Sequence, residues 1–150
     1  IYGIGCNAED ENSVQKIKEI TGRDKEKPLS ISAPNFKWIE NNCIIDVDLN
    51  KYLPGPYTLL LRKKDSSFMN HVSANEFLGI RIPACTFSDK GKRAGVPFIT
   101  TSINLSGEPF AKNIREIPKQ ILNKVDVIID EGSLNGNPST IIKDGKEIRR

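Results

Sequence analysis

Apolar residues recur at helical spacing in three stretches of this chain, and a fourth, more polar stretch is also assigned to a helix. In the first stretch, Val14, Ile17 and Ile20 fall on one face, and Gly22 follows where a helix would stop. A stripe of this kind is typical of a helix that packs against a core. We expect helices at residues 11–21, 35–42, 87–94 and 114–125.

Short apolar runs between prolines, glycines and polar residues indicate strands. We expect strands at residues 29–32, 57–61, 78–82, 97–101, 127–129 and 140–142, and an edge strand at 146–150. Helices and strands mix without strict alternation along the chain. This order predicts an α/β fold in which helices flank a twisted sheet of parallel and antiparallel strands.

Composition and cysteine use describe a single globular domain. Of 150 residues, 37% are hydrophobic and 27% are charged, and no stretch approaches the ~18 apolar residues of a membrane span. Cys6, Cys43 and Cys85 form no Cys-x-x-Cys pair, which argues against a disulfide framework or a zinc site. We therefore expect residues 1–150 to form one domain of a cytoplasmic protein, with no membrane partner and no metal held by the chain.

The basic residues are gathered in a few places, although the net charge of +3 is small. They lie at 16–27, 62–64, 90–93 and 143–150. Taken singly, each cluster is explained as a solvated surface. Taken together, they could line a site for an anion, because phosphates favour such clusters.

The segment GIGCNA at residues 3–8 fits the spacing of a dinucleotide-binding fingerprint. That fingerprint requires a helix that opens within it and an acidic residue at the end of the next strand. Here the helix pattern begins too late, and the strand at 29–32 ends without a carboxylate. We interpret residues 3–8 as a tight turn.

Several polar residues stand where a ligand could meet them. Ser102 and Asn104 follow the strand at 97–101, and the carboxyl end of a strand is where α/β sheets bind ligands. Arg81 interrupts an apolar strand, and a guanidinium there needs an anionic ligand or an internal salt bridge. Arg23 and Lys27 share a polar loop and offer donors suited to phosphates. A hydrogen-bonded turn without a ligand would equally explain residues 102–107.

Six motifs in a fixed order resemble those of the YrdC-like family. They are YGIGCNA at 2–8, GR and KPL at 22–29, PGPYTL at 54–59, GIRIP at 79–83, SINLSGEP at 102–109 and PSTII at 138–142. Each motif alone is weak, but the order is specific. The similarity extends over residues 1–150.

The resemblance implies a function as well as a fold with a basic concave cavity. It implies that the chain makes threonylcarbamoyl-AMP and pyrophosphate from L-threonine, bicarbonate and ATP, for the threonylcarbamoyladenosine modification of tRNA. It implies Mg²⁺ held mainly by ATP phosphates, and partner proteins that transfer the threonylcarbamoyl group. The family's first strand would precede Ile1, so we expect that strand to be missing from residues 1–150.

The resemblance also implies roles for individual residues. Those expected to bind the nucleotide are Arg23, Lys27, Ser102, Asn104 and Arg150, with Arg149 as the alternative to Arg150. Those expected to bind threonine are Arg81, Ser102 and Ser139. Thr21 departs from the family, which has a lysine there, so Lys18 or Lys25 would have to supply that phosphate contact. No acid or base catalyst is identified.

Two functions of other kinds fit the same resemblance. One is a YrdC-like module that binds double-stranded RNA or tRNA without synthase activity, a role mildly favoured by Thr21. The other is a carbamoyl-transfer domain of a hydrogenase maturation factor.

Overall fold

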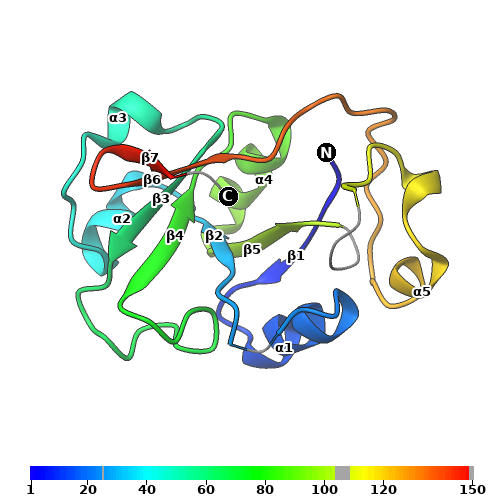
Figure 1. The fold of residues 1–150 in the computed structure, drawn as a ribbon, viewed down its shortest axis with the longest axis horizontal. Coiled ribbons are helices and arrows are strands. Elements are labelled where there is room, and N and C mark those ends of the chain that lie inside the picture. The colour runs from blue at the N-terminus through cyan, green and yellow to red at the C-terminus, as the bar shows by residue number, and fades with distance from the viewer. Residues whose placement is uncertain (25, 104–108, 149–150) are drawn as a thin grey trace.

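The computed structural model describes residues 1–24, 26–103 and 109–148. Within those residues it contains one seven-stranded sheet in the order β1-β5-β2-β4-β3-β6-β7 (Figure 1). The strands are β1 (Gly3–Asn7), β2 (Ser30–Ser32), β3 (Tyr57–Arg62), β4 (Phe77–Arg81), β5 (Phe98–Ser102), β6 (Thr140–Lys143) and β7 (Lys146–Ile148). The helices are α1 (Glu11–Ile20), α2 (Phe36–Asn42), α3 (Leu49–Tyr52), α4 (Thr86–Ala94) and α5 (Lys119–Leu122), with a 3₁₀ turn at Ile114–Glu116.

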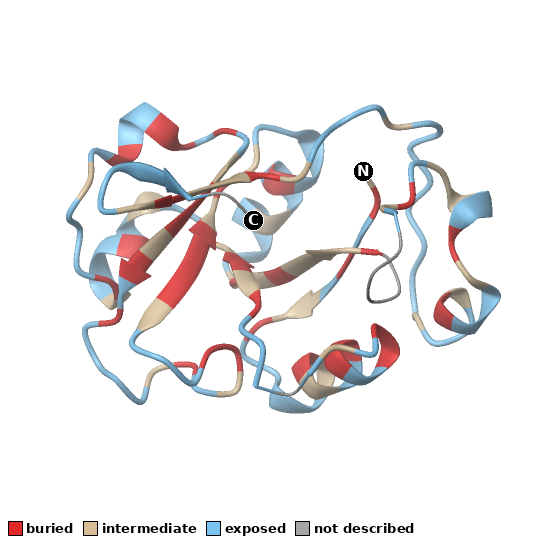
Figure 2. Ribbon diagram, viewed as in Figure 1, coloured by how far each residue is buried: buried red, intermediate tan, exposed pale blue. Residues whose placement is uncertain are grey.

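One face of the sheet is apolar and forms the core. Side chains alternate between faces along a strand, and residues paired across strands share a face. On the core face, Ile31 of β2 pairs with Ile80 of β4, which in turn pairs with Leu59 of β3. All three are completely buried and belong to one cluster with apolar residues of α1 and α2 (Figure 2). Burying each contributes about 1.5–3 kcal/mol to stability.

The opposite face carries small residues where β1, β5, β2 and β4 lie side by side. Gly5 pairs with Thr100, and Ser30 pairs with Gly79, in a single row across the four strands. A Cβ atom at Gly5 would lie 2.3 Å from the carbonyl oxygen of Ile99, so β1 can lie this close to β5 only if residue 5 is glycine. With so few side chains, this row leaves space above the sheet.

Helix α1 ends where its sequence pattern predicts. The Asp10 carboxylate caps its first turn by accepting two backbone N–H groups. At the other end Gly22 has φ of +60°, the left-handed conformation that favours glycine. The following N–H, of Arg23, then donates to the carbonyl oxygen of Lys18 at 2.9 Å. This turn sets the direction in which the Arg23 side chain leaves the helix.

Most of the predicted elements are confirmed within a few residues, and the mixed sheet is confirmed as well. The interpretation of residues 3–8 as a turn is wrong, because β1 occupies residues 3–7 and pairs antiparallel with β5. Its glycines suggested a turn, but they are needed for close strand contact. The short helix α3 was not predicted.

Two predicted elements beyond residue 113 are also wrong. The helix expected at 114–125 is interrupted at Pro118, which has no N–H to donate and holds Ile117 in an extended conformation. The strand expected at 127–129 has no strand partner among the described residues, and Val127 is 76% exposed. An apolar, β-prone run becomes a strand only when another strand pairs with it.

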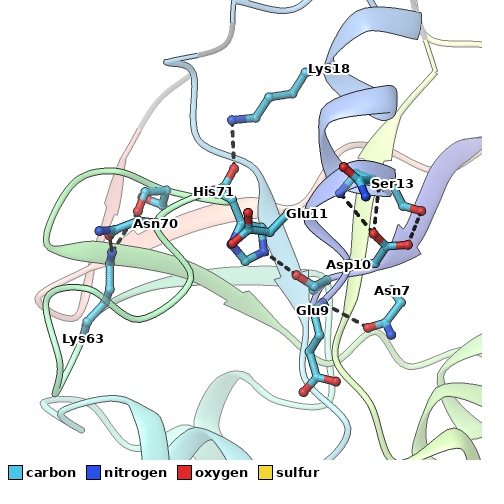
Figure 3. A network of polar contacts seen from close by, with 12 residues as sticks. Asn7, Glu9, Asp10, Glu11, Ser13, Lys18, Lys63, Asn70 and His71 are labelled. Carbon is cyan, nitrogen blue, oxygen red and sulfur yellow. Dashed lines mark hydrogen bonds and ion pairs between the residues drawn. The ribbon is translucent and has the colours of Figure 1, made fainter.

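A loop beside α1 is held by a buried ammonium group. Lys63 is only 4% exposed, and its Nζ donates to Ser66 O, Asn70 Oδ1 and Ser73 O at 3.2, 2.8 and 2.8 Å. Burial lowers the pKa of Lys63. The same loop accepts a hydrogen bond from Lys18 of α1 at the carbonyl oxygen of His71 (Figure 3). Lys63 thereby supports the helix that carries the Arg23 loop.

We predict that Lys63→Met lowers the free energy of unfolding by about 1–3 kcal/mol, because three acceptors lose their donor. Lys64→Met is the matched control, since the exposed Lys64 Nζ donates, among the described residues, to a single carbonyl oxygen, that of Glu40. It should change stability by less than about 0.5 kcal/mol. Urea denaturation of both variants measures the difference. Equal losses would contradict the role given to Lys63.

Candidate active site

A cleft of about 460 Å³ opens over the small-residue face of the sheet. Its floor is formed by β1 and β5, and its walls by the end of β4, the start of α4 and the chain that leads into β6. In Figure 1, α1 lies below β1 and β5, and the segment between α5 and β6 arches above them. A volume of this size is typical of small-molecule sites, for which ~300–1,000 Å³ is usual.

Three of the predicted site residues line this cleft together. They are Arg81, Ser102 and Ser139. Arg81 ends β4, Ser102 ends β5, and Ser139 lies just before β6 and is buried. The three residues predicted to bind threonine therefore line one cleft, although they are far apart in the sequence.

The strand register explains how Arg81 and Ser102 come to line the same cleft. Strand β2 pairs parallel to β4 but antiparallel to β5, so Arg81 and Ser102 end their strands at opposite edges of the sheet. What they share is a face: the register places both on the side of Gly5 and Thr100. The cleft thus crosses the strands, with Arg81 at the carboxyl end of β4 and Ser102 at the carboxyl end of β5.

Arg23 reaches the border of the cleft from the other face of the sheet. Its Nη2 donates to Thr101 Oγ1 at 3.2 Å, and its Nη1 donates to Pro28 O at 3.4 Å. Thr101 pairs with Ile4, which belongs to the apolar core. Lys27 is exposed on the same loop and is not part of the cleft lining. Asn104 and Arg150 lie outside the described residues.

Thr21 and Lys18 are both engaged in packing rather than at the cleft. The hydroxyl of the buried Thr21 donates to Ile17 O at 2.8 Å within α1. Lys18 is 6% exposed, and its Nζ donates to His71 O at 3.1 Å. Burial lowers the pKa of Lys18. Neither side chain is placed to supply the phosphate contact that the family assigns to a lysine here, and Lys25 lies outside the described residues.

The cleft contains further residues that were not predicted as site residues. Lys90 of α4 and Glu131 add a positive and a negative charge to its lining. Thr100 lies on the floor, and its Oγ1 is buried with no hydrogen-bond partner among the described residues. The basic cluster at 90–93 and the threonines at the end of β5 were the available signals. The basic character of the cavity as a whole remains a prediction.

Tyr2 anchors the segment that arches over the cleft. Its hydroxyl lies 2.8 Å from both Asp130 Oδ1 and Gly132 O, and it accepts the N–H of Glu131 at 3.0 Å. Burial, followed by the hydrogen bond to Asp130, raises the pKa of Tyr2. The N–H of Gly132, followed by the Tyr2 hydroxyl, lowers the pKa of Asp130. One side chain thus joins β1 to the turn at 130–132.

A second cavity, of about 310 Å³, lies on the α1 side of β1. Apolar side chains from α1, α5 and residues 125–129 make up most of its lining. Within the described residues, no three His, Cys, Asp or Glu side chains are grouped as a metal site would require. In the same part of the chain, no helix is long and apolar enough to cross a membrane.

We predict that Tyr2→Phe lowers the melting temperature at pH 7 by a few degrees, because the turn at 130–132 loses its anchor. Since the folded-state pKa of Asp130 is lowered, its contribution is present above the ordinary carboxyl value of about 4 and is lost as the pH falls through the folded-state pKa. The difference between Tyr2→Phe and wild type should therefore shrink below about pH 4. Thermal unfolding followed by circular dichroism from pH 3 to 8 tests this, and a difference independent of pH would contradict it.

Comparison with known proteins shows the family and the fold of this chain. The family model Sua5_yciO_yrdC, described as "Telomere recombination", matches residues 1–150. A Methanocaldococcus jannaschii protein, named provisionally as a threonylcarbamoyl-AMP synthase, is 38% identical over 148 residues. The match covers 95% of this chain and 70% of that protein.

Solved structures agree with the sequence comparison. The crystal structure of Pyrococcus abyssi Sua5 complexed with L-threonine superposes with a TM-score of 0.82 at 29% identity, over 95% of this chain and 44% of that one. Full-length HypF in a phosphate- and nucleotide-bound form gives a TM-score of 0.79 at 20% identity, over 94% of this chain but 23% of HypF. At that identity HypF shows a shared fold alone.

Proposed function

Because the chain belongs to the Sua5/YciO/YrdC family, we propose that it is an L-threonylcarbamoyl-AMP synthase, a nucleotidyltransferase that acts on L-threonine, bicarbonate and ATP. One observation carries the proposal: Arg81, Ser102 and Ser139 face a single cleft, in a fold shared with a threonine-bound structure. A cleft of about 460 Å³ has the size of a small-molecule site.

The chemistry needs two anions held close together. Threonine and bicarbonate give a carbamate with loss of water. A carbamate oxygen then attacks the α-phosphorus of ATP, and the bond from that phosphorus to pyrophosphate breaks. The protein's contribution is to position the carbamate against the phosphate and to balance their charges. No general acid or base is assigned.

We assign one group of residues to threonine and another to ATP. Arg81 pairs with the threonine carboxylate as a forked donor, and Ser139 lies beside it. Ser102, on the floor between β1 and the arching segment, meets the reacting phosphate and carbamate. Arg23, which already reaches β5, and Lys27 would bind the phosphate tail. Asn104 and Arg150, outside the described residues, would supply further nucleotide contacts.

Mg²⁺ fits this arrangement as an ion that arrives with ATP. Mg²⁺ prefers oxygen ligands, and in nucleotide sites it is usually held by the substrate's phosphates while it keeps several of its bound waters. The described residues offer no cluster of three or more His, Cys, Asp or Glu that would hold it independently. The ion would neutralise phosphate charge, and the chain's own cations Arg23 and Lys27 would orient the same phosphates.

The proposed product is used by other proteins, which transfer the threonylcarbamoyl group to tRNA. Binding of tRNA or double-stranded RNA by this chain is a partner interaction of the same proposal. The HypF likeness does not extend the proposal to carbamoyl transfer in hydrogenase maturation, because at 20% identity it concerns the fold. Strongly salt-dependent RNA binding without an ATP-dependent product would instead indicate an RNA-binding module.

The direct test is to incubate the protein with L-threonine, bicarbonate, ATP and Mg²⁺ and to analyse the mixture by mass spectrometry. We predict threonylcarbamoyl-AMP and pyrophosphate in equal amounts, and neither product when threonine or bicarbonate is omitted. L-Valine replaces threonine as the control for hydroxyl recognition. A folded protein that yields no threonylcarbamoyl-AMP would contradict the proposed function.

We predict that Arg81→Ala weakens threonine binding by about 10- to 100-fold, the range expected when a charged hydrogen bond is lost. ATP affinity should change by less than about threefold, because the proposal pairs Arg81 with threonine and not with ATP. Arg62→Ala is the matched control, because Arg62 ends β3 away from the cleft and pairs with Glu76. Calorimetric titration with each substrate measures both affinities, and equal losses of both would count against the role of Arg81.

A further inference from the structure

A buried pair of hydroxyl groups lies directly behind the threonine end of the cleft. Thr58 Oγ1 and Ser139 Oγ are 2.7 Å apart, and the two residues are 2% and 8% exposed. Ser139 lines the cleft, whereas Thr58 does not. Thr58 is thus not placed to contact a ligand, but it contacts a residue that is.

The register puts Thr58 between the two residues assigned to threonine. Leu59 of β3 pairs with Ile80 of β4, so Thr58 lies beside Arg81 on the adjacent strand and on the same face. On its other side Thr58 pairs with Ile141 of β6, two residues after Ser139. Thr58 therefore lies between Arg81 on β4 and the segment that carries Ser139 into β6.

The backbone on both sides of Thr58 is tied to one turn. The N–H of Gly55 donates to the carbonyl oxygen of Ile82 at 2.9 Å, just beyond Arg81. The N–H of Thr140, just beyond Ser139, donates to Pro56 O at 3.0 Å. A Cβ atom at Gly55 would lie 2.5 Å from Tyr52 O, so the turn keeps this shape only with glycine. The turn fixes the backbone next to Arg81 and the backbone next to Ser139. The hydrogen bond between Thr58 and Ser139 then orients the Ser139 side chain.

From this geometry we propose that Thr58 is the positioning residue for Ser139 in threonine binding. A serine side chain can adopt three rotamers, and a hydroxyl has one donor and two acceptor sites. The hydrogen bond between Thr58 and Ser139 selects one rotamer and occupies one of those sites. It thereby fixes the Ser139 side chain at the cleft that Arg81 also lines. The inference rests on the proposed function, since it assigns threonine to this end of the cleft.

The test uses Thr58→Val, which keeps the branched shape and removes the hydroxyl, and Thr58→Ser, which keeps the hydroxyl. Calorimetry without turnover gives the affinity of each variant for L-threonine and for ATP. We expect Thr58→Val to weaken threonine binding about 5- to 10-fold, as for the loss of one hydrogen bond. Thr58→Ser should stay within about twofold of wild type, as should ATP binding by both variants. If Thr58→Val does not fold, Thr58→Ala takes its place.

A double-mutant cycle separates positioning from a general loss of stability. If Thr58 acts through Ser139, the double variant with Ser139→Ala binds threonine no more weakly than Ser139→Ala alone. Additive losses, an equal loss for ATP, or a Thr58→Ser variant as weak as Thr58→Val would each overturn the proposal, as would a wild-type protein that does not bind threonine. Absence of threonylcarbamoyl-AMP from wild type, with this coupling intact, would refute the proposed function but not the positioning role.

Discussion

The alternation of side chains along paired strands divides this sheet into an apolar face and a face of small and polar residues, and the cleft depends on that division. The core face holds fully buried residues such as Ile31 and Ile80. The other face has Gly5 and Gly79 where larger side chains would fill the space. Stability and binding are thereby assigned to opposite sides of the same strands.

A site built on a face differs from one built at strand ends. Strands β4 and β5 run in opposite directions, yet Arg81 and Ser102 line the same cleft because the register places them on the same side of the sheet. The segment that arches over the cleft is attached to the start of β1 by the Tyr2 side chain, which bonds to the turn at 130–132. Behind the wall, Thr58 contacts Ser139. The cleft-lining Ser139 is thus supported by a residue outside the cleft lining.

The sequence predicts much of this fold, and the failures have physical causes. Helix α1 and the central strands follow from local apolar spacing. The break at Pro118 was readable from proline's missing N–H and was overlooked. The exposed run at 127–129 has strand propensity but no strand partner among the described residues. Propensity alone does not show whether a partner strand is present. The contact of Thr58 with Ser139 spans 81 residues, so only the folded chain brings it to light.

The proposed function requires that Arg81 of β4, Ser102 of β5 and Ser139, just before β6, form one threonine-binding surface. Titration of the isotope-labelled protein with L-threonine, followed by amide NMR spectra, tests it most directly. We predict that the amide signals of Arg81, Ser102 and Ser139 shift together with a single saturation curve. Signals of α2, on the core side of the sheet, should not move. Shifts confined to other surfaces, or separate saturation curves for the three residues, would contradict the account.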